Sequence, residues 1–220
     1  MNDGPESNGN TSDDIISRIS NSKNNTYHDP LKFLDTLSDQ KHIVLFYEDI
    51  VAARIVEFHF IKNGLSKGQD GVYTFSKDTE ISFIEDEMIR SGIDVEDSKK
   101  KGLLHIRQIS DARKYREGPI KGFSSIVKEI MAELKSSSRF RMIARAIPDV
   151  YTEEQMAAEL EVERAYHSSF DSFGGSLLSS YPVKQIEPRS RGKWIEDILQ
   201  NHHSAIFVTK PGQGIAFNLE

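Results

Sequence analysis

Short apolar runs alternate with longer segments that carry apolar residues at helical spacing along most of this chain. Each run is too short for a helix and is rich in β-forming residues, so it predicts a buried strand. The predicted strands cover residues 43–47, 71–75, 103–106, 141–147 and 177–181. The predicted amphipathic helices cover residues 51–63, 78–91, 123–134, 152–173 and 193–201.

Repeated strand–helix units predict an α/β fold with a mostly parallel sheet that is covered by helices on both faces. Two further apolar runs, 205–208 and 215–217, flank a glycine-containing turn and predict a C-terminal antiparallel hairpin at the sheet edge. Thr152 and Gln155 have the spacing of a capping box, which predicts the start of a long helix. The acidic stretch 94–97 predicts a turn before the third strand.

Composition indicates which residues belong to the folded domain and which classes of partner are expected. Residues 1–26 are rich in Asn, Ser, Asp and Gly, so we expect a disordered tail followed by one domain over residues 27–220. The net charge is −6, and the basic triplet Lys99–Lys101 follows two acids, so direct nucleic-acid binding is not expected. The absence of cysteine excludes disulfides and thiolate-rich zinc sites. With neither a signal peptide nor a long apolar run, we expect a cytoplasmic protein without a membrane segment.

The turn after the first strand lacks the chemistry of a nucleotide phosphate loop. Such a loop has the form GxxxxGK(S/T), in which glycines free backbone N–H groups and the lysine supplies a charge for phosphate. Here the turn reads Tyr-Glu-Asp-Ile-Val, with two carboxylates and no glycine. Acids at a helix N-terminus suit the helix dipole but repel a triphosphate. The turn therefore predicts a sensing or scaffolding role rather than catalysis, with no catalytic residues and no cofactor.

A ligand crevice is expected at the carboxyl ends of the strands, because loops and helix N-termini converge there in parallel sheets. The residues predicted to lie at this crevice are Tyr47, Glu48, Asp49, Arg145, Asp149 and Tyr181. Arg145 is expected to pair with Asp149 or Glu48, since a lone charge beside an apolar sheet is costly. The tyrosines offer flat apolar faces with a polar tip, which suits a small, partly apolar ligand. Two structural alternatives stay open: a helix cap made by the first-strand acids, and an ion pair that closes an empty crevice.

The histidines give no metal signature. His202 and His203 are adjacent, so they point to different faces, and no HxxxH spacing is present. We therefore expect no metal site, with His203 facing the ligand pocket and His202 capping a helix. His42 begins the first strand and is expected to be structural, at the end of the sheet opposite the pocket.

Several short segments, taken in order, resemble a known sensory family. They are His42 to Asp49 (HIVLFYED), Gly64-Leu65 with Gly68, residues 91–95, Gly102-Leu103, residues 145–149, residues 159–163, Ser180-Tyr181, and Asn201-His202 with residues 205–207. Together they resemble the MEDS domain, the methanogen/methylotroph sensory domain, over about residues 42–218. Two positions depart from the family pattern. Pro148-Asp149 stands where the family often has Gly-Glu, and Ser180 stands where it often has cysteine.

The resemblance implies a RecA/KaiC-like core that has lost its phosphate loop and serves archaeal or bacterial signal transduction. It implies a signalling partner, such as a histidine kinase or a transcription regulator, and a small hydrocarbon-derived ligand. Assembly of several copies is a further role to consider, since RecA-like cores commonly pack side by side. The alternative function is an ATP-binding or ATP-hydrolysing RecA/KaiC-like protein, in which Asp149 would hold a metal ion or activate water.

Overall fold

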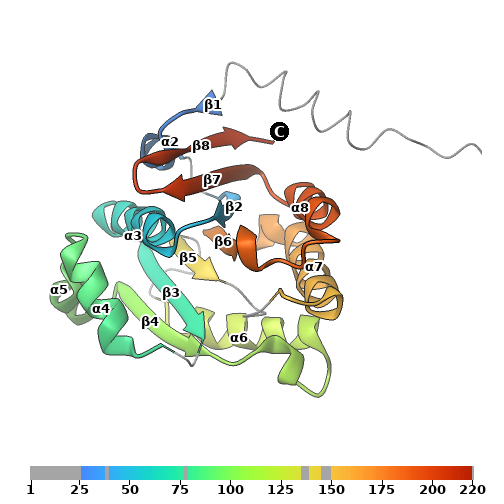
Figure 1. Ribbon diagram of the computed structural model, residues 1–220. Helices are drawn as coiled ribbons and strands as arrows, with labels where there is room; N and C mark the ends of the chain where they lie inside the picture. The colour runs from blue at the N-terminus through green and yellow to red at the C-terminus, as the bar shows by residue number, and fades with distance from the viewer. Residues whose placement is uncertain (1–25, 38–39, 77–78, 135–138, 145–149, 220) are drawn as a thin grey trace, which may run out of the picture.

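The computed structural model describes residues 26–37, 40–76, 79–134, 139–144 and 150–219. These residues form an eight-stranded sheet with the strand order β1-β8-β7-β2-β6-β5-β3-β4. The strands are β1 (Thr26–Tyr27), β2 (His42–Tyr47), β3 (Asp70–Ser76), β4 (Leu104–Ile109), β5 (Phe140–Ala144), β6 (Ser176–Pro182), β7 (Ser204–Lys210) and β8 (Gln213–Asn218). The predicted α/β fold with a mostly parallel sheet is confirmed (Figure 1).

The C-terminal hairpin is confirmed, but its two strands differ in role. β7 pairs in parallel with β2, so it belongs to the parallel part of the sheet. Only β8 runs antiparallel to β7, and the short strand β1 then pairs antiparallel with β8. The sequence did not predict β1, because two residues are too few to show an alternating pattern.

Helices cover both faces of the sheet, as the sequence predicted (Figure 1). The helices that pack on the first face are α2 (Pro30–Thr36), α3 (Ile50–Ser66), α4 (Ile81–Arg90) and α5 (Val95–Lys100). Those on the second face are α6 (Pro119–Met131), α7 (Glu153–Ser168) and α8 (Arg191–Leu199). Within the described residues, the single 3-10 turns η2 (Ala112–Lys114), η3 (Phe170–Ser172) and η4 (Val183–Gln185) join these elements.

The acidic stretch 94–97 is part of helix α5, and the prediction of a turn there was wrong. Asp94 is the N-cap, and its carboxylate accepts a hydrogen bond from the backbone N–H of Asp97 at 3.0 Å. Val95 is buried against the first-face core. A helix of six residues is too short to show helical periodicity, so its cap resembles a turn in the sequence.

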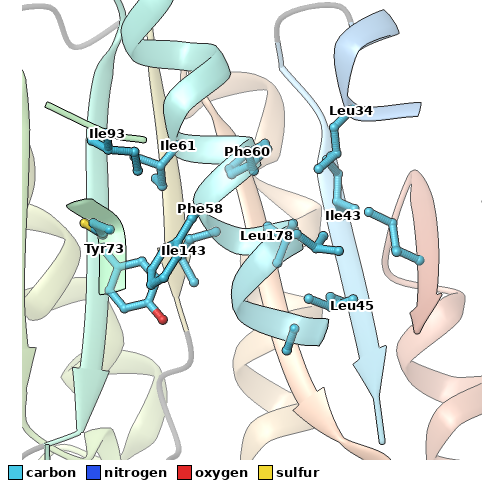
Figure 2. Packing of buried hydrophobic residues seen from close by; sticks show 14 of the residues in the cluster. Leu34, Ile43, Leu45, Phe58, Phe60, Ile61, Tyr73, Ile93, Ile143 and Leu178 are labelled. Carbon is cyan, nitrogen blue, oxygen red and sulfur yellow. The ribbon is translucent and has the colours of Figure 1, made fainter. Parts of the chain in front are cut away.

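Strand β2 is buried on both faces, which explains why its sequence is a continuous apolar run. Ile43 and Leu45 pack beneath α3 on the first face, while Val44 and Phe46 belong to the second-face core. Figure 2 shows α3 lying across the first face with Phe58 and Ile61 directed into the packed layer.

Helix α7 begins at the capping box that the sequence predicted. The Thr152 hydroxyl accepts from the Gln155 N–H at 3.2 Å, and the Gln155 side chain accepts from the Thr152 N–H at 3.0 Å. This start places Glu159 and Glu163, one turn apart, on the buried side of α7 against the sheet.

Candidate functional site

A cavity of about 190 Å³ lies at the carboxyl edge of the sheet. Its walls come from the last residues of β2 to β6, from the N-terminal half of α3, and from α4 and the turn before η2. The predicted crevice at the strand ends is thus present as a geometric feature. For scale, a dry engineered cavity of about 150 Å³ holds a benzene molecule. The cavity at this edge therefore has room for a molecule only slightly larger than benzene.

A buried carboxylate from α3 lies in the cavity wall. Glu57 is 5% exposed, and its Oε2 accepts a hydrogen bond from the phenolic hydroxyl of Tyr73 on β3 at 2.7 Å. Figure 2 shows Tyr73 within the packed layer between α3 and the sheet. Burial and the neighbouring Glu57 raise the pKa of Tyr73 well above its ordinary value. The phenol therefore keeps its proton and donates a hydrogen bond to the carboxylate.

Arg54 supplies a cation to the same wall, one turn before Glu57 on α3. Its guanidinium lies over the Phe83 ring at 4.8 Å from the centroid, and Nη1 is 3.7 Å from Oε2 of Glu87. These contacts hold Arg54 from α4 on its outer side. The cavity wall thus contains a carboxylate, a guanidinium and a phenol.

The remaining walls mix apolar residues with the hydroxyl-bearing residues Thr74, Ser76, Thr79, Ser110 and Ser180, and one further charged pair lies at the rim. The apolar lining residues are Ile50, Phe75, Ile84, Ile109, Ile143 and Ala144. Asp111 Oδ1 accepts from the Arg113 backbone N–H at 2.9 Å and from Nε at 3.0 Å, and Oδ2 pairs with Nη2 at 2.5 Å. Burial alone would raise the pKa of Asp111, but the hydrogen bonds from Arg113 outweigh it and lower this pKa.

The acids after β2 have structural roles in the turn. The Asp49 carboxylate accepts from the backbone N–H groups of Val51 at 2.7 Å and Ala52 at 3.2 Å, so Asp49 is the N-cap of α3. Glu48 is exposed, and its Oε2 lies 3.0 Å from Nζ of Lys184. Of the three residues predicted at this strand end, Tyr47 lines the cavity, whereas Glu48 and Asp49 do not.

Tyr181 lies on the other face of the sheet, so its predicted place in the pocket was wrong. It is fully buried, and its hydroxyl lies 2.6 Å from Glu159 Oε1 and 2.5 Å from Glu163 Oε1 on α7. Its neighbour Ser180 lines the cavity instead. Successive residues of a strand point to opposite faces, so a prediction of the strand end alone does not choose between them.

His203 lies at the opposite edge of the sheet from the cavity, so its predicted place in the pocket was also wrong. It directly precedes β7, and its Nδ1 accepts a hydrogen bond from the backbone N–H of His42 at 2.9 Å. Because β7 and β2 are parallel, both residues stand at the amino ends of their strands. Arg145 and Asp149 lie outside the described residues.

Sequence reasoning missed Arg54, Glu57 and Tyr73. The available signal was the pair of charges at positions 54 and 57 inside a segment that is otherwise almost continuously apolar. Charged residues on the buried side of such a helix need partners, and this requirement marks a polar site. The partner of Glu57 is on β3, and spacing along the chain does not reveal it.

A second group of polar side chains is buried at the amino edge of the sheet. It consists of His42 at the start of β2, Glu163 on α7 and His202 after α8, and we refer to it as the His–Glu cluster. Oε2 of Glu163 lies 3.1 Å from Nε2 of His42 and 3.6 Å from Nε2 of His202. Burial alone would raise the pKa of Glu163, but His202 and His42 outweigh it and lower this pKa to about 2. Burial and the nearby His42 lower the pKa of His202 to about 3.

Comparison with known protein families identifies a family that matches this chain. Residues 41–203 match the methanogen/methylotroph, DcmR sensory domain family, abbreviated MEDS. The chain belongs to the MEDS family. The matched range runs from the start of β2 to the residue before β7, so it includes the cavity at the carboxyl edge and the His–Glu cluster. The family description names a sensory domain, which suggests a role in signal transduction and a non-enzymatic function.

Solved structures support the fold of this MEDS domain. A KaiC-like protein from the hyperthermophilic archaeon Pyrococcus horikoshii superposes with a TM-score of 0.56, at 14% sequence identity. The alignment covers 79% of this chain and 73% of the archaeal protein. At this identity the likeness concerns the fold, and it agrees with the predicted RecA/KaiC-like core. No curated protein matches the sequence. Within the described part of the chain, no helix has the length and apolar character needed to cross a membrane.

Proposed function

We propose that this MEDS domain is a non-catalytic sensory domain that binds a small molecule in the cavity at the carboxyl edge. Binding of this molecule would then change the interaction of the domain with a signalling protein, such as a histidine kinase or a transcription regulator. The observation that carries the proposal is the buried Glu57 carboxylate, which accepts a hydrogen bond from Tyr73 in the wall of a cavity with both polar and apolar lining. Buried polar groups in a cleft that also has apolar walls are typical of a site that orients a ligand.

The cavity favours a ligand of limited size and mixed polarity. Drug-sized ligands occupy about 300–1,000 Å³, which exceeds the space described at this edge. A ligand with a short apolar body fits the isoleucine walls, and a donor group such as a hydroxyl or an amine fits Glu57. An acceptor group would point to Arg54 on the same helix. Small oxygenated or aminated hydrocarbons satisfy these requirements.

Arg145 and Asp149 remain part of the proposed site. They follow Ala144, which lines the cavity at the end of β5. With Tyr47, they are the residues of the sequence prediction that we retain as ligand contacts. Their pairing with one another also remains a proposal. The proposal includes a cytoplasmic location, which a sequence without cysteine fits.

The turn after β2 argues against the alternative of ATP binding. The Asp49 carboxylate occupies the backbone donors of Val51 and Ala52, which a phosphate group would need at the N-terminus of α3. A second negative charge, Glu48, stands beside it. The turn thus presents acid in the place where a nucleotide-binding protein presents amide hydrogens and a lysine.

A thermal-shift screen tests the proposed function. The screen would contain small alcohols, amines and carboxylic acids with two to six carbon atoms, and hits would be confirmed by calorimetric titration. A ligand at 100 times its Kd stabilises the folded state by about 2.7 kcal/mol. Glu57→Gln should abolish the shift, and Glu154→Gln, at an exposed position on α7, is the matched control. A hit that stabilises the Glu57→Gln protein as strongly as the wild type would place the ligand elsewhere.

A further inference from the structure

The His–Glu cluster joins three segments that are distant in the sequence, at the edge of the sheet opposite the cavity. His42 begins β2, Glu163 belongs to the third turn of α7, and His202 lies in the connection between α8 and β7. All three side chains are nearly inaccessible, with exposed fractions of 0%, 4% and 3% respectively. One ligand-type atom of each residue lies within 4.8 Å of the others.

The hydrogen bonds around His202 aim one of its nitrogen lone pairs into the cluster. Nδ1 of His202 lies 2.7 Å from the carbonyl oxygen of Ile198, which can only accept, so Nδ1 carries the hydrogen. In the neutral ring, Nε2 then bears the lone pair, and it faces Oε2 of Glu163. A histidine that donates its other N–H to a backbone carbonyl is the usual arrangement for a metal ligand.

His42 differs from His202 in that neither of its ring nitrogens has a hydrogen-bond partner among the described residues. Among the described residues, Nε2 of His42 and Nε2 of His202 both lack a hydrogen-bond partner of acceptable geometry, although both approach the same carboxylate oxygen. The second oxygen of Glu163 accepts from the hydroxyl of Tyr181, which orients the carboxylate. Two imidazole nitrogens and one carboxylate oxygen therefore lie within 4.8 Å of one another in a buried space.

The two distances from the Glu163 oxygen to the histidine nitrogens are compatible with a shared small ion. Two ligand atoms that each lie about 2.0–2.1 Å from a tetrahedral ion are about 3.3 Å apart. The Glu163 oxygen is 3.1 Å from one histidine nitrogen and 3.6 Å from the other, so both separations lie close to this value. Buried polar atoms without hydrogen bonds are rare and need a compensating partner.

We propose that His42, Glu163 and His202 bind one divalent transition-metal ion of the zinc class. Imidazole ligands favour zinc, iron, nickel or copper over magnesium and calcium, which prefer oxygen ligands. Three protein ligands leave a fourth position for water or another small ligand. The ion would cross-link β2, α7 and the α8–β7 connection, and it would offset the negative charge of Glu163. This site is separate from the cavity of the proposed function.

Metal loading of the whole chain tests the proposal. The protein, purified without a histidine tag, would be analysed for metal content, stripped with a chelator, and refolded from guanidinium with Zn²⁺ or Co²⁺. Refolding is included because burial of the ligands slows entry into the folded protein. We expect one ion per chain, a visible absorption band of bound Co²⁺, and a rise in Tm of roughly 5–10 °C at a metal concentration of 100 Kd.

Variants separate the site from general binding by histidines. Glu163→Gln and His202→Asn should weaken Zn²⁺ binding by more than about 100-fold, since even outer-shell changes cost 10–100-fold. His59→Ala removes a histidine on α3 outside the cluster and should bind as the wild type does. If a cluster variant does not fold, the effect of the chelator on the Tm of the wild type tests the proposal instead. Wild-type protein that takes up no stoichiometric ion by either route, or cluster variants that bind normally, would overturn the proposal in favour of a buried ion pair.

Discussion

The phenolic hydroxyl of Tyr73 donates a hydrogen bond to Oε2 of Glu57 across 2.7 Å, and both residues line the cavity at the carboxyl edge of the sheet. The bond joins α3 to β3 through Glu57, which is the glutamate of α3 and is buried. It therefore links the stability of the domain to the polarity of the proposed ligand site.

Tyr73→Phe should destabilise the folded domain by about 1–3 kcal/mol, because it removes a donor from a buried carboxylate and leaves that group less well satisfied. Urea unfolding followed by circular dichroism measures the change. Tyr151→Phe is the matched control, since Tyr151 is 50% exposed and its loss should stay within about 0.5 kcal/mol. Equal effects of the two changes would show that the Tyr73–Glu57 bond contributes nothing specific.

Calorimetric titration with ATP and Mg²⁺ should give no binding in the micromolar range. The Asp49 carboxylate already uses the donors at the N-terminus of α3, and Glu48 adds a second negative charge. The prediction is contradicted by a micromolar Kd that Asp149→Ala abolishes, because that result would assign a metal-binding role to the acid after the fourth predicted strand.

Removal of residues 1–24 should leave Tm within a few degrees of the full chain. These residues carry too few apolar side chains to offset an ordering entropy of about 1–2 kcal/mol per residue. A chain that starts at His28 is the comparison, because it also lacks β1. It loses the pairing with β8 and the edge-to-face contact of Tyr27 with Phe33, so its Tm should fall further. A large fall already on removal of residues 1–24 would mean that this segment docks on the domain.

Asp111→Asn should destabilise the domain at pH 7 by about 1–2 kcal/mol, by weakening the cap of η2 and the ion pair with Arg113. The folded pKa of Asp111 is depressed below its ordinary value of 3.8, so its contribution is present above the unfolded pKa and is lost as pH falls through the folded pKa. Urea unfolding of both proteins at pH 7 and near pH 2 measures this. A stability difference that persists unchanged at acid pH would assign the effect to packing.

Local sequence was sufficient for most of the secondary structure. Apolar runs such as the one in β2 predict strands because a parallel strand is covered on both faces, and the capping box of Thr152 predicts the start of α7 from side chains three residues apart. Short elements escaped detection. β1 and α5 have two and six residues, and each is held by its tertiary neighbours more than by its own pattern.

The site was predictable only in its general position. The carboxyl edge of the sheet follows from parallel strands, and Tyr47 lines the cavity at this edge. Whether Ser180 or Tyr181 faces the cavity depends on which side of β6 meets α7, and local sequence does not specify that side. Glu57 and Tyr73 lie in separate elements, so their partnership required the packing of α3 on β3.

By itself, the sequence determined the order of the longer strands and helices, the sensory family and the absence of a phosphate loop, because these properties lie in short windows of the chain. The tertiary structure alone decided which distant residues meet. Glu57 meets Tyr73 at one edge of the sheet, and His42 meets Glu163 and His202 at the other. These meetings depend on β2 lying between β6 and β7 and on the face that each strand presents to a helix. Long-range packing determines the strand order and the face that each strand presents, because it buries the apolar faces. The local sequence pattern does not specify which element packs against a given face.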